Sequence, residues 1–198
     1  TKISILVELG TWEGNSTEAW CRTVETVHTV DFFASPIFIK HILPKYNNLK
    51  YIHDNTINAS KNFLDNSIDM IYIDAGHSYD NVFNDILSWF PKIRKNGIVA
   101  GHDFLVVTKA DTKSSERKDY WAEYSAKNKI VKKLGVEMVA KNDVAKAIIS
   151  LLGVPDWWDV QNAPNTVGGN WFFKKTPELV EIFNNNFKEY KRKIIFGK

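Results

Sequence analysis

The sequence predicts an α/β protein built on a largely parallel, doubly wound sheet. Its first hundred residues alternate short apolar runs with runs of helical periodicity, the pattern of repeated strand-helix-strand units. Each apolar run ends in a polar or glycine-containing turn, as is typical of buried parallel strands. With 198 residues and 44% hydrophobic side chains, the chain has enough apolar material for one core, so we expect a single domain over 1–198. The expected strands are 3–9, 27–31, 49–53, 68–74 and 97–102.

Helices are expected between these strands. Asn15 or Ser16 can cap a helix that runs to residue 24, Ser35 can cap one that runs to 43, and 58–64 forms a short third helix. The fourth helix has a continuous apolar stripe at helical spacing, which predicts that it packs against the sheet. The stripe consists of Tyr79, Val82, Phe83, Ile86, Leu87 and Phe90.

The second half of the chain is less regular. Residues 108–128 are polar and charged, and they predict a long loop or lid with a helical piece, a kind of segment that is often functional. Asn142 or Asp143 can cap a helix to residue 152, and 157–160 and 170–174 have the pattern of two late strands. Pro177 can begin a final helix that runs to about 191.

Charge and cysteine content exclude several classes of protein. The 26 basic and 23 acidic residues leave a net charge of +3 without a long basic run, so we expect no nucleic-acid partner. The single cysteine, Cys21, cannot form an internal disulfide, which favours a reducing compartment such as the cytoplasm. No apolar stretch approaches the roughly 20 residues that span a bilayer. Because the first strand begins at Ile3, we expect a domain cut from a longer chain.

The turn after the first strand is typical of a nucleotide-type loop, because an acid ends the strand and glycines precede a helix. Gly10 and Gly14 stand four residues apart, which differs from the GxGxxG of dinucleotide enzymes. A pyrophosphate would meet Glu8 and Glu13 and be repelled. A cofactor with positive charge and no phosphate, such as S-adenosylmethionine, suits the loop better. Asp31 ends the second strand, where an acid accepts hydrogen bonds from both ribose hydroxyls.

Ligands of such sheets bind beyond the carboxyl ends of the strands. The polar side chains at those ends are therefore expected to share one rim. They are Asp31 after the second strand, Asp54 and Asn55 after the third, Asp74 and His77 after the fourth, and His102 and Asp103 after the fifth.

Four segments, VELGTWEGNST, VDFF, IYIDAGHSYD and NGIVAGHDF, resemble the successive motifs of class I S-adenosylmethionine-dependent methyltransferases. More narrowly, they are similar to methyltransferase family 24, a branch related to macrocin and rhamnosyl O-methyltransferases and to cephalosporin-hydroxylase-like proteins. The resemblance covers about 3–104. It implies a Rossmann-like sheet of seven strands with the last strand antiparallel and helices on both faces.

The resemblance also implies roles for individual residues. The methionine end of the cofactor would lie against the first loop, at Glu8, Gly10, Thr11, Trp12, Gly14 and Ser16. The ribose would lie at Asp31, the adenine near Asp54 and Asn55, and the transferred methyl beside Asp74, with Ala75 also in the cofactor site. In sugar-modifying relatives, acids after the fourth and fifth strands bind a divalent metal. Asp74, His102 and Asp103 would bind Mg²⁺ or Mn²⁺ here, with His102 and Gly76 standing where relatives have acids.

Methyl transfer is a direct displacement that requires an aligned nucleophile and removal of its proton. A sugar hydroxyl is a poor acid, so it needs a metal or a base. His77 is the leading candidate base, since an imidazole accepts a proton near neutral pH, and His102 is the second; Asp74 completes the catalytic set. We therefore expect O-methylation of a sugar, with rhamnose favoured, and a glycosyltransferase as fused or separate partner. Tyr120, Trp121, Tyr124, Trp157 and Trp158 are candidates for walls that stack on a sugar ring, although such residues more often serve in packing.

Three alternatives stay open. The acceptor could be a catechol or another phenol, which would require the metal. The chain could be a module that binds the cofactor or a partner without catalysis. A nicotinamide-dependent reductase is disfavoured by the acids of the first loop. Structural roles are also available, since Asp31 and His77 could each cap the helix that follows, and the aromatic residues could serve in packing.

Overall fold

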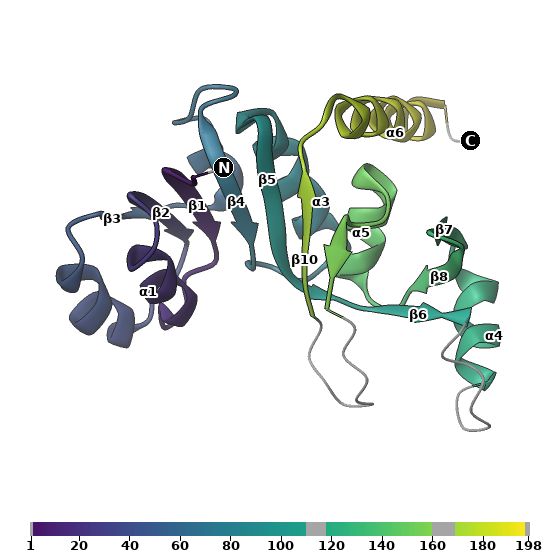
Figure 1. Cartoon of the computed structure of the whole chain (residues 1–198), viewed down its shortest axis with the longest axis horizontal. Coiled ribbons are helices and arrows are strands. Elements are labelled where there is room, and N and C mark those ends of the chain that lie inside the picture. The colour runs from purple at the N-terminus through teal and green to yellow at the C-terminus, as the bar shows by residue number, and fades with distance from the viewer. Residues whose placement is uncertain (1, 110–117, 160–168, 197–198) are drawn as a thin grey trace.

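A computed structural model describes residues 2–109, 118–159 and 169–196. It is a mixed α/β structure around one seven-stranded sheet, as predicted (Figure 1). The order of the strands is β3-β2-β1-β4-β5-β10-β9. Their bounds are β1 Ile5–Leu9, β2 Thr26–Asp31, β3 Leu49–His53, β4 Ile68–Ile73, β5 Ile93–Phe104, β9 Trp157–Trp158 and β10 Gly169–Lys174.

The five strands from β3 to β5 pair in parallel, and the late strands close the sheet antiparallel. β10 is antiparallel to β5, and β9 is antiparallel to β10. Leu6 of β1 pairs with Val27 of β2 on one side and with Met70 of β4 on the other. The chain thus builds outward from β1 to β3 and then returns to the opposite side of β1, so the strand order reverses between β1 and β4. Ligands bind in the crevice that such a reversal leaves.

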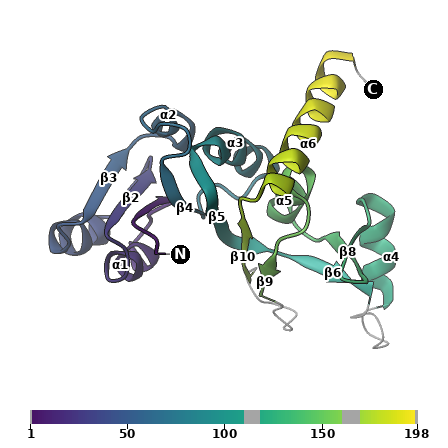
Figure 2. The same ribbon diagram turned by 45° about the horizontal axis from the view of Figure 1, so that its top comes forward.

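Helices cover both faces of the sheet (Figure 2). α1 lies on one face, and α2 and α3 lie on the other. The buried side chains form two hydrophobic cores. Because side chains alternate along a strand, Leu6 of β1 lies in one of them, the first core, and Val7 and Leu9 lie in the other, the second core. The bounds of the helices are α1 Asn15–Cys21, α2 Thr56–Ser60, α3 Tyr79–Trp89, α4 Lys118–Lys127, α5 Asp143–Leu152 and α6 Pro177–Phe196.

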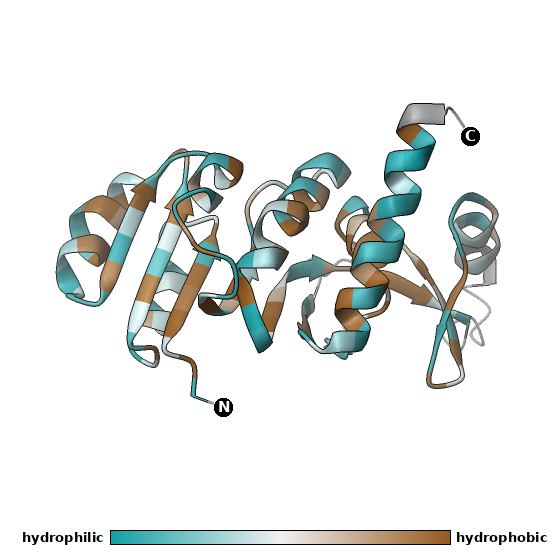
Figure 3. Ribbon diagram, turned by 90° about the horizontal axis from the view of Figure 1, so that it is seen from above, coloured by the Kyte–Doolittle hydropathy of each residue, from teal (hydrophilic) through white to brown (hydrophobic). Residues whose placement is uncertain are grey.

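The apolar stripe expected of α3 and the cap expected of α5 are confirmed, but the cap expected at Asn15 or Ser16 is wrong, because Gly14, which has no side chain, is the residue that precedes α1. Ser78 caps α3 by accepting a hydrogen bond from the backbone N–H of Asn81 at 3.3 Å, and the predicted stripe of α3 faces the second core. Asn142 caps α5 by accepting one from Ala145 at 3.0 Å. α6 is amphipathic in Figure 3, with Leu179 and Phe183 buried.

Several boundaries differ from expectation. α1 ends at Cys21, three residues before the expected end, α2 covers Thr56–Ser60 in place of 58–64, and α6 continues to Phe196. β5 begins at Ile93, four residues before the predicted start. Arg94 and the two residues after it are polar, so this part of the strand lacks the apolar pattern on which the prediction rested. The helix expected over 35–43 is a π-helix at Phe38–Ile42 and a 3-10 turn at Leu43–Lys45, which contains Pro44, a residue without a backbone N–H to donate. Ser35 still acts as its cap, accepting from Phe38 N–H at 3.2 Å.

A second, three-stranded antiparallel sheet was not predicted. Its order is β6-β8-β7, with β6 at Val106–Thr108, β7 at Val131–Lys133 and β8 at Val136–Ala140. α4 is the helical piece expected within 108–128, and 110–117 of that segment lie outside the described residues. Across the described ranges, no helix is both long and apolar enough to cross a membrane.

Candidate active site

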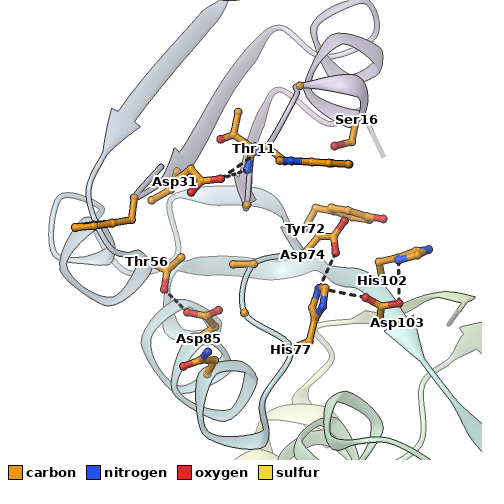
Figure 4. A pocket seen from close by; sticks show the side chains of 18 of the residues that line it. Thr11, Ser16, Asp31, Thr56, Tyr72, Asp74, His77, Asp85, His102 and Asp103 are labelled. Atoms are coloured by element: carbon orange, nitrogen blue, oxygen red, sulfur yellow. Dashed lines mark hydrogen bonds and ion pairs between the residues drawn. The ribbon is translucent and has the colours of Figure 1, made fainter. Parts of the chain in front are cut away.

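A pocket of about 900 Å³ lies beyond the carboxyl ends of β1, β2, β4 and β5, at the reversal of strand order (Figure 4). Most of the site residues expected from the sequence line this one pocket. They are Gly10, Thr11, Trp12, Gly14, Ser16, Asp31, Asn55, Asp74, Ala75, His77, His102 and Asp103.

The glycines of the first loop let the chain turn closely over the end of β4. Gly10 has φ +95°, and a Cβ there would come within 2.0 Å of the carbonyl oxygen of Asp74. Gly14 has φ +82°, and its N–H donates to the carbonyl of Thr11 at 2.8 Å. Residues with side chains rarely adopt such φ values, so glycine is required at both positions. The loop therefore presents its backbone to the pocket.

Asp31 ties the end of β2 to this loop. Its Oδ2 accepts hydrogen bonds from the N–H groups of Thr11 at 2.7 Å and Trp12 at 3.1 Å. Its Oδ1 accepts one from Phe33 N–H at 2.9 Å. A carboxylate oxygen can accept two hydrogen bonds, so Oδ2 is already satisfied and Oδ1 keeps capacity for one donor from a ligand. The side chains of Trp12 and Phe32 flank the mouth of the pocket and are 71% and 73% exposed.

Two residues expected in the cofactor site do not line the pocket. Glu8 is fully buried behind the loop, where its Oε2 accepts hydrogen bonds from the hydroxyls of Thr17 and of Thr29, the latter at 2.8 Å. Burial raises the pKa of Glu8 above its ordinary value. The Oδ1 of Asp54 accepts from the N–H of Asn55 at 2.7 Å, at the edge of the loop before α2. Glu8 therefore supports the first loop from behind, and Asp54 lies outside the pocket.

The ends of β4 and β5 bring two carboxylates and two imidazoles together (Figure 4). Nε2 of His77 lies 3.4 Å from Oδ1 of Asp74 and 3.1 Å from Oδ2 of Asp103. Nδ1 of His102 lies 3.4 Å from Oδ1 of Asp103. Burial raises the pKa of Asp74, and the neighbouring imidazoles offset part of that effect. Asp103 has φ +60°, a left-handed conformation that places its carboxyl toward the cluster.

Three of these four residues lie close enough together to hold a metal ion. One ligand atom from each of Asp74, His102 and Asp103 can be chosen so that all lie within 4.8 Å of one another. Two carboxylate oxygens and one imidazole nitrogen form a donor set that suits Mn²⁺ and, less well, Mg²⁺, which prefers oxygen alone. The residues therefore fit the divalent ion expected from the sequence.

Several pocket residues were missed by the sequence reasoning. The hydroxyl of Tyr72 donates to Oδ1 of Asn170 at 2.7 Å, and both line the pocket although they are far apart in the chain. Asn81 and Asp85 of α3 line its opposite wall with Thr56. Asn81 and Asp85 stand four residues apart beside the apolar stripe of α3, and this spacing was the sequence signal that could have identified them as neighbours on one face of the helix.

The candidate sugar-stacking residues whose side chains the structure describes lie outside the pocket. Trp157 stacks on Phe172, with ring centroids 5.8 Å apart, and Trp158 packs against Phe104 at 6.1 Å. Neither tryptophan lines the pocket, and neither do Trp121 and Tyr124 of α4. The side chain of Tyr120 lies outside the described residues. Among the described residues, the pocket is lined by the aromatic side chains of Trp12, Phe32 and Tyr72.

Comparison with known proteins agrees with the fold. Residues 7–104 match the family model Methyltransf_24, described as a methyltransferase domain. Among curated protein sequences, no relative matches the chain.

Three solved structures illustrate the structural similarity. The 1,6-didemethyltoxoflavin-N1-methyltransferase of Burkholderia thailandensis, solved with S-adenosylhomocysteine, aligns with TM-score 0.57 and 10% identity over 88% of this chain and 72% of its own. Phosphoethanolamine N-methyltransferase 1 of Haemonchus contortus aligns with TM-score 0.54 and 14% identity over 97% and 44%. SMU.1697c of Streptococcus mutans, also solved with S-adenosylhomocysteine, aligns with TM-score 0.52 and 13% identity over 88% and 89%.

These identities are low, so the structures are similar in fold, and the family match carries the assignment of activity. The matched segment contains the loop after β1 and the acids that end β2, β4 and β5. The match over 7–104, the fold and the pocket at its strand reversal together support a class I S-adenosylmethionine-dependent methyltransferase.

Proposed function

We propose that this protein transfers the methyl group of S-adenosylmethionine to a hydroxyl of a sugar, in a glycan or a glycosylated metabolite, with a rhamnose-type acceptor favoured. The observation that carries the proposal is the cluster of Asp74, His77, His102 and Asp103 at the rim of the pocket. A neutral amine can attack a methyl group directly, whereas a hydroxyl must lose its proton. A rim with two imidazoles beside two carboxylates supplies groups for that task.

The proposed orientation of the cofactor follows from the polar groups of the pocket. The loop from Gly10 to Ser16 presents backbone groups for the methionine part, and Oδ1 of Asp31 is available to a ribose hydroxyl. The sulfonium then lies toward Asp74, whose negative charge favours a cation nearby. Glu8 adds a buried carboxyl behind the same loop.

His77 is the proposed base. Its imidazole accepts the proton of the acceptor hydroxyl while the oxygen attacks the methyl carbon. The new C–O bond forms as the C–S bond breaks, and S-adenosylhomocysteine leaves with the electron pair on sulfur. Asp103 and Asp74 lie within 3.4 Å of Nε2 of His77 and stabilise the imidazolium that results. His102 lies on the other side of Asp103 and is the alternative base.

Asp74, His102 and Asp103 are the residues that would hold a divalent metal. When bound, Mn²⁺ or Mg²⁺ lowers the pKa of a coordinated hydroxyl and can orient two neighbouring hydroxyls. His77 is left outside that donor set, so it remains available as base in either case.

The test is transfer of tritium from methyl-labelled S-adenosylmethionine to rhamnose-bearing glycans and to catechols, each with Mn²⁺, with Mg²⁺ and with EDTA. We expect label in the glycan. Labelling of catechols alone, dependent on metal, would instead assign a phenol O-methyltransferase. Binding of S-adenosylhomocysteine without transfer to any acceptor would assign a non-catalytic module. A glycosyltransferase that builds the acceptor is the partner we propose.

A further inference from the structure

Asp85 is a buried acid in the wall of the pocket, away from the cluster of acids and histidines. It lies in the middle of α3 and is 2% exposed, yet it lines the pocket together with Thr56 and Asn81. The hydroxyl of Thr56 donates a hydrogen bond to Oδ1 of Asp85. Among the residues that the structure describes, none donates to Oδ2. One oxygen of a buried carboxyl therefore has capacity for a donor that comes from the pocket.

Packing alone does not account for this acid. Aspartate is a poor former of helix interiors, and a buried carboxylate is costly unless it is hydrogen-bonded. Burial accordingly raises the pKa of Asp85 to about 6. α2 does not need the acid as an anchor, because the indole N–H of Trp89 donates to the carbonyl of Thr56 at 2.9 Å and Asn55 caps the helix.

In the cofactor orientation proposed above, Asp85 lies toward the nucleobase end. In an adenosyl group the base is attached at C1′ and the sulfur is attached through C5′ to C4′, so the two extend from either side of the ring oxygen and point away from each other. With the ribose at Asp31 and the sulfur toward Asp74, the base extends toward α2 and α3, where Thr56, Ile57 and Asp85 line the pocket. Figure 4 shows Thr56 and Asp85 together below Asp31, apart from His77, His102 and Asp103.

We propose that Asp85 accepts a hydrogen bond from the exocyclic amine of the cofactor's adenine and so makes the pocket select a 6-amino purine. This inference rests on the proposed function. Adenine presents an N–H donor at its 6-position, which a carboxylate oxygen accepts. The deaminated base, hypoxanthine, presents a carbonyl oxygen there, which a carboxylate repels. The side-chain amide of Asp85→Asn can donate a hydrogen bond to that carbonyl. The variant therefore replaces repulsion of hypoxanthine with a favourable contact.

The experiment is calorimetric titration of the full chain with S-adenosylhomocysteine and with its deaminated analogue, S-inosylhomocysteine. We expect the unmodified protein to bind the adenosyl compound about tenfold or more tightly than the inosyl compound, the range for one hydrogen bond to a charged group. Asp85→Asn should weaken the adenosyl compound and strengthen the inosyl compound, so that the ratio of the two affinities falls at least about tenfold. Because the ratio is measured in one protein, it does not depend on how much of the variant is folded.

Thr56→Val is the matched control. It removes the hydroxyl that Asp85 accepts but keeps the acid, so we expect it to preserve the preference for the adenosyl compound. A ratio unchanged in Asp85→Asn would overturn the inference while the proposed function stands. If Asp85→Asn and Thr56→Val each lowered the affinities for the adenosyl and the inosyl compound by the same factor, Asp85 would be assigned to anchoring α2, which also overturns the inference. Failure of the unmodified protein to bind S-adenosylhomocysteine would overturn the inference and the proposed function together.

Discussion

Nε2 of His77 lies 3.1 Å from Oδ2 of Asp103, although His77 follows β4 and Asp103 lies near the end of β5. The pairing of β4 with β5 brings them together, because Ile73 lies beside Gly101 in the register of the two strands. A base held by a carboxylate keeps its orientation and is stabilised when it becomes charged. The parallel pairing of β4 and β5 therefore positions the groups that the proposed proton transfer requires.

Replacing His77 tests that role. We expect His77→Ala to lower kcat by about 10² to 10⁴, the usual contribution of a general base, with little change in the affinity for S-adenosylhomocysteine. His41→Ala is the control, since His41 is exposed and does not line the pocket. Steady-state rates with the labelled acceptor, together with calorimetry, separate the two effects. A variant that keeps full turnover would remove His77 from the mechanism and leave His102 as the candidate.

The contact of Gly10 with β4 predicts an unequal cost of two glycine substitutions. Gly10→Ala places a Cβ 2.0 Å from the Asp74 carbonyl at φ +95°, so we expect it to lower the free energy of unfolding by at least about 3 kcal/mol. Gly135 has φ +82° and no atom within 4 Å of a Cβ, so Gly135→Ala should cost about 1 kcal/mol. Urea unfolding of both variants measures the difference. Equal costs would show that the loop can move away from β4.

The raised pKa of Asp85 predicts how its replacement changes stability with pH. The folded protein holds the proton of Asp85 up to about pH 6, and the unfolded chain releases it near 3.8. Between these values the folded state binds more protons, so the contribution of Asp85 to stability falls as pH rises, by about 3 kcal/mol in all. Asp85→Asn should therefore raise the free energy of unfolding at pH 7 and leave it nearly unchanged at pH 4.

Asp80 supplies the control for that comparison, because it lies exposed in the first turn of the same helix. Asp80→Asn should change stability by no more than about 0.5 kcal/mol at either pH. Chemical unfolding of both variants and of the unmodified protein at pH 4 and pH 7 gives the four changes in the free energy of unfolding. If Asp85→Asn destabilised the protein equally at both pH values, the contact with Thr56 would outweigh the burial of the charge.

Much of the pocket could be predicted from the sequence because it forms at strand ends. A buried strand is a short apolar run, and the first polar residue after it marks the rim, as Asp31 and Asp74 do. Once the strands are recognised, their parallel arrangement brings these residues to one edge. The same reasoning placed Asp54 in the pocket, but the chain turns after β3 so that Asn55 and Thr56 line it instead.

What could not be predicted depends on which way a side chain faces or on pairing across long distances. Asp85 reaches the pocket from the middle of a helix, where no strand end marks it. The β7–β8 hairpin turns at Leu134 and Gly135, both with positive φ, and a Leu-Gly pair gives a weaker turn signal than Asn-Gly. Trp157 and Trp158 were available for stacking by residue type alone, and the pairing of β9 with β10 directs them to Phe172 and Phe104.

The measurement that tests the account most directly is calorimetric titration with S-adenosylhomocysteine of the unmodified protein, Asp31→Ala and Asp54→Ala. Asp31 lines the pocket and holds the first loop, so we expect saturable binding by the unmodified protein and a loss of about 100-fold or more in Asp31→Ala. Asp54 does not line the pocket, so Asp54→Ala should bind within about twofold of the unmodified protein. Absence of binding by the unmodified protein, or equal binding by all three, would contradict a cofactor site built on Asp31.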